Sequence, residues 1–314
     1  MIACILLRMA TRQIAPEAGI LAPALRSRDR IGSVLLDLTK PRLALFSICS
    51  GLAGYGVADS EAGIGRLAIV LAGLALSAGG ALSLNQWWER DIDRRMRRTA
   101  QRPIPRGAIS PGAALAWSVA LGVGGVGIFL ERGLPLAALI AAATIGIYGL
   151  VYTPLKPRTR WATEMGSISG ALPPLIGAAA AGDPGSKPAW LLAGILLFWQ
   201  MPHSFAVGWM HRDDYRQAGF PLLPAVDPTG GRTAGWALAY TLGLLVVSLA
   251  PWALGGVGPV YGIVAAVGGL GLLVAGVRFL TQSDRRDRRG RDLFLASILY
   301  LPPVMAALVI DRWT

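Results

Sequence analysis

The sequence predicts an all-α protein that crosses a lipid bilayer nine times as a bundle of transmembrane helices. Of the 314 residues, 54% are hydrophobic and only 15% are charged, whereas a soluble domain carries about a quarter charged residues. The mean hydropathy is +0.51. The apolar residues form long continuous runs, not the short alternating segments that are typical of a transmembrane β-barrel. The 40 glycines and 21 prolines lie within these runs, where membrane helices tolerate them.

Nine segments have the roughly 17–25 apolar residues that a helix needs to cross the hydrocarbon core. They are residues 42–58, 66–88, 112–130, 134–152, 162–181, 189–210, 233–254, 258–278 and 292–310. The first is the most polar of the nine, because Pro41 and Arg42 precede its apolar part and Ser47 and Ser50 interrupt it. We expect residues 35–314 to form one transmembrane domain and residues 1–34 to form a cytoplasmic tail, with a mitochondrial transit peptide as the alternative for the tail.

Basic residues predict the orientation of these spans. All but four of the 30 Lys and Arg residues lie in the N-terminal region or in the loops after the second, fourth, sixth and eighth spans; the exceptions are Arg66, Arg132, Lys187 and Arg312. Cytoplasmic loops of membrane proteins are enriched in Lys and Arg. We therefore expect a cytoplasmic N-terminus and an outside C-terminus in the cell inner membrane, or in the mitochondrial inner membrane of a eukaryote. The net charge of +12 is attributed to this topology and not to nucleic-acid binding.

The second span runs into the charged stretch NQWWERDIDRRMRRTAQRPIPRG, residues 85–107. Asn85, Glu89 and Asp93 are spaced i, i+4 and i+8, which places three oxygen-bearing side chains on one stripe of a helix. Such ligands suit a hard cation, Mg²⁺. Asp91 faces elsewhere and is expected to pair with a neighbouring arginine. The alternative is a solvated loop whose charges only set topology, which explains the arginines but not the acidic stripe.

A second polar stretch closes the sixth span. Asp213 and Asp214 form another acidic pair on the same side of the membrane, and two acidic clusters can hold a diphosphate through bridging Mg²⁺. His203 lies inside the span, where an ionisable residue indicates function, although a lone histidine in a helix also serves as a packing residue. For His211, nearer the interface, packing is the better interpretation.

The two remaining charged connections carry weaker signals. Tyr152 and Lys156 lie four residues apart on either side of Pro154, which disfavours an ideal helix through them. Lys156 can neutralise a leaving diphosphate or simply contribute to topology. Residues 284–292 have no helical spacing and are interpreted as topological charge.

In these stretches the chain resembles the UbiA-type intramembrane prenyltransferases, and within them the branch that modifies haem. The acidic motif runs into Arg-Thr and Arg-Pro as Asn85, Glu89, Asp91, Asp93, Met96, Arg98, Thr99, Arg102 and Pro103. A Tyr-Thr and Lys motif follows as Tyr152, Thr153 and Lys156, and then a small-residue segment as Gly170, Pro173, Pro174 and Gly177. The last motif is Pro202, His203, Phe205, Asp214, Tyr215, Ala218, Gly219, Pro221, Leu223 and Pro224. The resemblance covers residues 35–310.

Four positions depart from the family pattern. Glu89 replaces the usual Asp, which keeps the charge on a longer arm, and Gln86 stands where many quinone-type enzymes carry Asp. Ser204 and His211 occupy positions that are acidic in quinone-type relatives. These last differences favour the haem-modifying branch.

The resemblance implies a nine-helix bundle of UbiA type around a central cavity, in which a farnesyl group passes from farnesyl diphosphate to a vinyl group of protohaem IX and water adds to give haem O. It implies a Mg²⁺-held diphosphate at Asn85, Glu89, Asp93, Asp213 and Asp214, with Arg98, Arg102, Tyr152 and Lys156 completing the site. We add the expectation that His203 binds the haem iron, because imidazole is a common axial ligand. Haem A synthase or a terminal oxidase is the candidate assembly partner.

Two alternatives remain at this point. A prenyltransferase of the same type can act on an aromatic quinone precursor in place of haem. A membrane transporter also needs polar residues inside its spans, although it more often shows internal repeats with broken helices at the bilayer midplane.

Overall fold

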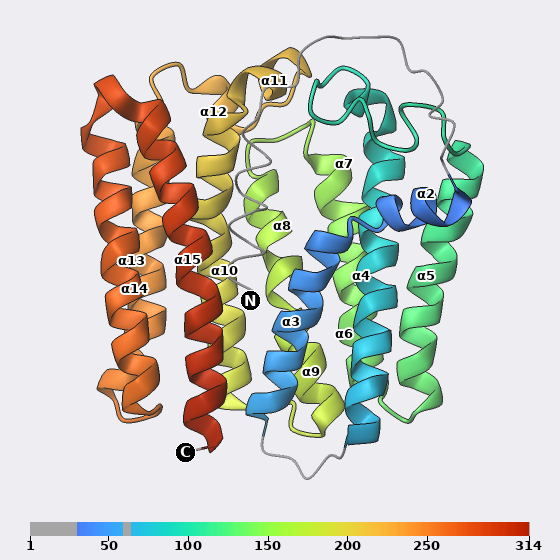
Figure 1. Cartoon of the computed structure of the whole chain (residues 1–314), viewed down its shortest axis with the longest axis horizontal. Helices are drawn as coiled ribbons and strands as arrows, with labels where there is room; N and C mark the ends of the chain where they lie inside the picture. The colour runs from blue at the N-terminus through green and yellow to red at the C-terminus, as the bar shows by residue number, and fades with distance from the viewer. Residues whose placement is uncertain (1–29, 59–63, 314) are drawn as a thin grey trace. The chain divides into compact units, whose positions relative to one another are not determined.

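The computed structural model describes residues 30–58 and 64–313, and within them it contains helices and no strands (Figure 1). The expected all-α fold is therefore confirmed. The expected tail falls almost wholly outside the described residues, and α2 (Ile31–Leu38) already runs across its boundary at residue 34. The other elements are α3 (Pro41–Val57), α4 (Ile64–Asp93), α5 (Pro111–Glu131), α6 (Pro135–Ile145), the π-helix η1 (Gly146–Tyr152), α7 (Thr153–Leu155), α8 (Ala162–Ala171), α9 (Pro173–Ala181), α10 (Lys187–Met210), α11 (Arg212–Gln217), α12 (Leu223–Val226), α13 (Gly231–Ala253), α14 (Pro259–Thr281), η2 (Ser283–Arg285) and α15 (Arg286–Trp313).

Seven helical stretches in the described part of the chain are long and apolar enough to cross a membrane. They correspond to seven of the nine expected spans, and the fourth of those spans contains the π-helix η1 between α6 and α7. The other two expected spans are helical but shorter. Residues 42–58 form α3, which has 17 residues. Residues 162–181 are divided at Leu172 into α8 and α9, because Pro173 and Pro174 follow and a proline cannot donate a backbone hydrogen bond to the preceding turn.

The described chain divides into two compact units, and the division falls within α10. The amino-terminal unit comprises the described residues up to Leu197 together with Asp213–Leu222. In it, α4 packs on α3 and α5, and α9 packs on α3 and α6. The carboxy-terminal unit comprises Phe198–Arg212 and the chain from Leu223 onward, and in it α14 packs on both α13 and α15.

Glycines allow α3 and α9 to approach closely in the amino-terminal unit. A Cβ atom on Gly177 would collide with the backbone oxygen of Gly51, and one on Gly54 would collide with the backbone of Pro174. Small residues at such contacts are the usual means by which membrane helices pack, because lipid offers no hydrophobic driving force between them. The segment that the sequence marked by Pro173, Pro174 and Gly177 is therefore a packing surface.

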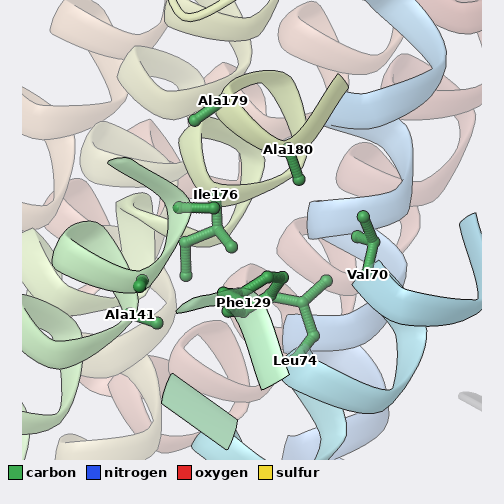
Figure 2. Close-up of a cluster of buried hydrophobic side chains, with 9 residues drawn as sticks. Val70, Leu74, Phe129, Ala141, Ile176, Ala179 and Ala180 are labelled. Atoms are coloured by element: carbon green, nitrogen blue, oxygen red, sulfur yellow. The ribbon is translucent and has the colours of Figure 1, made fainter. Parts of the chain in front are cut away.

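A cluster of buried apolar side chains is shared by α4, α5, α6 and α9 (Figure 2). Phe129 is fully buried beside Leu74, and Ile176 faces the same cluster. Gly73 provides room for the Phe129 ring, because a Cβ there would overlap it. The cluster fixes α4 against three neighbouring helices and so holds the helix whose last turns carry the acidic stripe.

Polar contacts join the helices of the carboxy-terminal unit. The Asp311 carboxylate on α15 accepts a 2.8 Å hydrogen bond from the Tyr261 backbone N–H in the first turn of α14, a group that has no partner within its own helix. Tyr300 and Ser248 form a buried 2.6 Å hydrogen bond between α15 and α13. These bonds fix the register of the three helices.

Candidate active site

The last two turns of α4 bury the acidic stripe that the sequence predicted. Asn85, Glu89 and Asp93 lie on one face of the helix and are 2%, 6% and 2% exposed. Asp91 is instead exposed and pairs with Arg90 and Arg94, as expected. Because buried carboxylates are stable only when they are paired, the partners of the stripe define the site.

Arg102, from the loop after α4, contacts both carboxylates. Its Nη1 lies 2.6 Å from Asp93 Oδ2 and 3.3 Å from Glu89 Oε2. The loop is held in place by Thr99, whose hydroxyl donates a 3.1 Å hydrogen bond to the Asp93 carbonyl. Burial alone would lower the pKa of Arg102, but the Asp93 and Glu89 carboxylates outweigh burial and raise it. Arg102 is therefore a permanent cation.

Lys156 reaches the stripe from the end of α7, the short helix that follows the π-helix η1. Its Nζ lies 2.9 Å from Glu89 Oε1, and its backbone N–H donates to the Tyr152 carbonyl, so the two residues lie one turn apart despite Pro154. The wider turn of η1 is stabilised by Thr153, which donates to the Tyr148 carbonyl and accepts from Asn85. Burial opposes the charge of Lys156, but Glu89 outweighs it and raises the pKa of the ammonium group. Wide π-turns of this kind are frequent at functional sites.

Lys40 is a site residue that sequence reasoning missed. Its Nζ donates a 2.5 Å hydrogen bond to Asn85 Oδ1. Its φ of 46° makes it the one non-glycine residue in the described chain with positive φ, a strained conformation that is typical of functional positions. Gln86 holds this turn by donating to the Asp37 and Leu38 carbonyls. Burial, followed by repulsion from Arg102, lowers the pKa of Lys40 well below its ordinary value.

Tyr215 on α11 was quoted from the sequence only as part of the family motif, without a role in the site. Its hydroxyl accepts a 3.0 Å hydrogen bond from Arg98, and Lys156 Nζ lies 5.7 Å from the centre of its ring. Phe220 covers Lys156 at 5.1 Å. Burial would raise the pKa of the Tyr215 phenol, but Arg98 and Lys156 outweigh burial and lower it.

No group of three or more acidic side chains joins the second acidic pair to this cluster in the described part of the chain, and the expected part of the pair in diphosphate binding stays a prediction. The Asp213 side chain is 66% exposed and pairs with Arg216. Asp214 is half-buried but joins neither carboxylate of the stripe in a metal-binding group. Tyr215 is the buried residue of the short helix α11. Because neighbouring residues on a helix point in different directions, Asp213 faces water.

His203 lies in the carboxy-terminal unit, on α10, with its Nδ1 2.9 Å from the Ser297 hydroxyl. Residues 284–292 form η2 and the start of α15, which was not foreseen as a helix.

Comparison with known proteins identifies the family. The model of the UbiA prenyltransferase family matches residues 44–298. The chain belongs to the UbiA prenyltransferase family. It is 45% identical to the protoheme IX farnesyltransferase of Opitutus terrae over 88% of this chain and 94% of that protein. It is 40% identical to the protoheme IX farnesyltransferase of Solibacter usitatus over 88% of this chain and 98% of that protein.

A solved structure confirms the UbiA fold. The UbiA homologue from Archaeoglobus fulgidus, bound to GPP and Mg²⁺, superposes with a TM-score of 0.60 at 14% identity over 88% of this chain and 99% of that chain. Together with the family match, the apolar helices make this UbiA member a multi-pass membrane protein.

The donors of the UbiA site fit a magnesium ion in part. The stripe offers one amide and two carboxylate oxygens, the hard ligands that Mg²⁺ prefers. Both Glu89 oxygens and Asp93 Oδ2 contact Arg102 or Lys156, so Mg²⁺ has to displace these cations to bind the same atoms. No group of three or more His, Cys, Asp or Glu side chains suited to a metal occurs in the described ranges. A bound diphosphate therefore has to supply part of the coordination shell.

Proposed function

We propose that this chain transfers a farnesyl group from farnesyl diphosphate to a vinyl group of protohaem IX, with addition of water to give haem O. Membership of the UbiA family supports the prenyl transfer. The protoheme IX farnesyltransferases of Opitutus terrae and Solibacter usitatus match nearly their whole length, which supports the choice of both substrates.

The observation that carries the proposal is the charge balance of the buried cluster. Two carboxylates, Glu89 and Asp93, face the cations Arg102 and Lys156, and Lys40 adds a third positive charge when it is protonated. With Lys40 protonated, the cluster has an excess of positive charge in a partly dehydrated place, where electrostatic attraction is stronger than in water. A diphosphate supplies the negative charge that this surplus favours.

Asn85, Glu89 and Asp93 are proposed to hold Mg²⁺ against the diphosphate. When bound, Mg²⁺ supplies positive charge that draws electrons toward the leaving oxygen. The structure of the Archaeoglobus fulgidus homologue with GPP and Mg²⁺ supports this requirement for the family. Asp213 is left out of the proposed site because it faces solvent.

The chain's own cations are proposed to stabilise the leaving group. As the allylic C–O bond breaks, its electron pair moves to the diphosphate, and Arg102, Lys156 and Lys40 hold that charge. Arg98 and Tyr152 line the same site, Arg98 through Tyr215 and Tyr152 beside the Lys156 ammonium group at 6.0 Å. Preorganised donors of this kind usually contribute the largest share of catalysis.

The allylic cation then needs an acceptor and protection from water. The vinyl π electrons of haem form the new C–C bond, and one water molecule adds to the remaining cationic carbon and loses a proton. The apolar side chains of the helices exclude water until then.

The distribution of basic residues supports a cytoplasmic N-terminus and an outside C-terminus in the inner membrane, of a mitochondrion if the source is eukaryotic. Haem A synthase or a terminal oxidase is the proposed recipient of the product.

The test is an acceptor competition with purified protein in nanodiscs. Farnesyl diphosphate, Mg²⁺ and equal amounts of protohaem IX and 4-hydroxybenzoate are supplied, and the extracted products are identified by mass spectrometry. We expect the hydroxyethylfarnesyl haem alone. Farnesylated hydroxybenzoate without farnesylated haem would refute the choice of acceptor, and no product from either acceptor would refute the activity.

A further inference from the structure

His203 is held by one hydrogen bond and two aromatic rings, all within the carboxy-terminal unit. Its Nδ1 lies 2.9 Å from the hydroxyl of Ser297 on α15. One face of the imidazole stacks on Trp199 at 4.9 Å and 22°, and Phe294 lies 5.1 Å away at 35°. These contacts leave the ring few alternative orientations.

The Ser297 hydroxyl determines which ring nitrogen carries the proton. The hydroxyl has one proton, and it donates this proton over 2.7 Å to the Phe294 carbonyl. Ser297 is fully buried, and its own carbonyl accepts from Trp199 Nε1 at 2.7 Å, so the residue is fixed at both ends. Since the hydroxyl proton is already used, the oxygen accepts from His203, which places the imidazole proton on Nδ1.

The opposite nitrogen, Nε2, then carries no proton and has a free lone pair. Nε2 has no hydrogen-bond partner in the part of the chain that the structure describes. The atom is also not fully buried, since it does not belong to the buried, unpaired side-chain atoms of the described residues. His203 is correspondingly half-buried. Histidines that bind metals almost always donate their other ring N–H to an oxygen, which fixes tautomer and orientation and raises the basicity of the ligand.

We propose that His203 Nε2 binds the haem iron and that Ser297 is the positioning residue that keeps this nitrogen unprotonated; the inference rests on the proposed use of haem as acceptor. The ligand is neutral imidazole, which is a common axial ligand of haem. The Phe294 ring, 5.1 Å from the imidazole, packs against His203 and opposes a rotation that would turn Nδ1–H toward the iron.

The experiment is a titration of the full-length protein in nanodiscs with two probes, ferric protohaem IX and metal-free protoporphyrin IX. Ligation through His203 predicts that His203→Ala loses the imidazole-type Soret band and weakens haem binding at least tenfold, while the affinity for metal-free porphyrin stays unchanged. Added free imidazole should restore the Soret band.

Ser297→Ala should weaken haem binding about tenfold, in the range found for residues that orient a metal ligand. His211→Ala, which removes the other histidine, is the matched control and should retain the wild-type spectrum.

Each other outcome overturns the inference. An unchanged Soret band and haem affinity in His203→Ala would show that the residue only packs. Equal losses for haem and metal-free porphyrin, without rescue by imidazole, would show that the substitution changes the shape of the protein and not an iron ligand. A wild-type protein that binds a farnesyl diphosphate analogue with Mg²⁺ but no haem would instead refute the proposed acceptor together with this inference.

Discussion

Replacing Glu89 with Gln tests the buried cluster most directly, because it removes one negative charge and almost no volume. In the structure the Glu89 carboxylate bonds Lys156 at 2.9 Å and Arg102 at 3.3 Å. The variant leaves Lys40, Lys156 and Arg102 facing the single carboxylate of Asp93. The excess positive charge of the cluster therefore rises by one unit.

The expected loss of stability follows from which contacts survive. Removing one partner of a buried ion pair costs about 3–5 kcal/mol. Arg102 keeps its 2.6 Å contact with Asp93, and the Lys156 side chain is 13% exposed, so we expect the lower end, about 3 kcal/mol. Turnover should fall at least about 100-fold, because the substitution removes a proposed metal ligand and displaces Lys156, which is a proposed charge-stabilising group.

The assay measures haem O formation and Mg²⁺-dependent binding of a non-hydrolysable farnesyl diphosphate analogue on monodisperse protein. Asp91→Asn is the matched control, because Asp91 lies two residues away on the same helix but is exposed and pairs with surface arginines. It should retain wild-type turnover. Normal turnover of Glu89→Gln across a Mg²⁺ titration would refute the assignment of the diphosphate site, and an equal loss in Asp91→Asn would show that the effect comes from local charge alone.

Three further substitutions probe the fold and the limits of the site. Lys40→Met should weaken binding of the farnesyl diphosphate analogue about tenfold or more, because a hydrogen bond to a charged group contributes about 1.5–3 kcal/mol; unchanged affinity in a calorimetric titration would remove Lys40 from the site. Asp213→Asn should leave turnover within about twofold, since this exposed pair contributes little, and a large loss would return Asp213 to the site. Gly177→Val should lower the thermal stability in detergent, because the added side chain collides with Gly51; a stability equal to wild type would mean that α3 and α9 separate freely.

The sequence predicted the helices well because the membrane imposes a simple rule on them. A span needs about 20 apolar residues, and the bounds of residues 112–130, 233–254 and 258–278 each lie within about three residues of those of the observed α5, α13 and α14. The hydropathy of residues 162–181 does not reveal that the segment is divided at Leu172 into two helices. The consecutive prolines 173 and 174 were the available signal, and they were interpreted as a family motif and not as the start of a new helix.

The acidic stripe was predictable because its geometry is local. Three residues spaced by four lie on one face of any helix, so Asn85, Glu89 and Asp93 could be grouped without a structure. Tyr215 could not, since its role depends on contacts with Arg98 and Lys156, far away in the sequence. Asp213 and Asp214 are adjacent in the sequence and suggested a second acidic cluster, but adjacent residues on a helix point in different directions, and Tyr215 is the α11 residue that contacts Arg98.

The missed cation shows why basic residues are the hardest to interpret from such a sequence. Lys40 belongs to the large set of Lys and Arg residues that membrane topology already explains, so composition alone gives no reason to single it out.

Burial and partners distinguish a basic residue of the site from one that only sets topology. The Arg94 side chain is 57% exposed and pairs with an exposed aspartate, whereas Arg102 and Lys156 reach buried carboxylates. A buried cation costs free energy unless a negative charge accompanies it, and two carboxylates cannot neutralise Lys40 in addition to Arg102 and Lys156. Burial and Arg102 lower the pKa of Lys40, so its charged form needs a further negative charge. An anionic ligand removes this shortage of negative charge. The shortage therefore argues for a diphosphate more strongly than the acidic stripe alone.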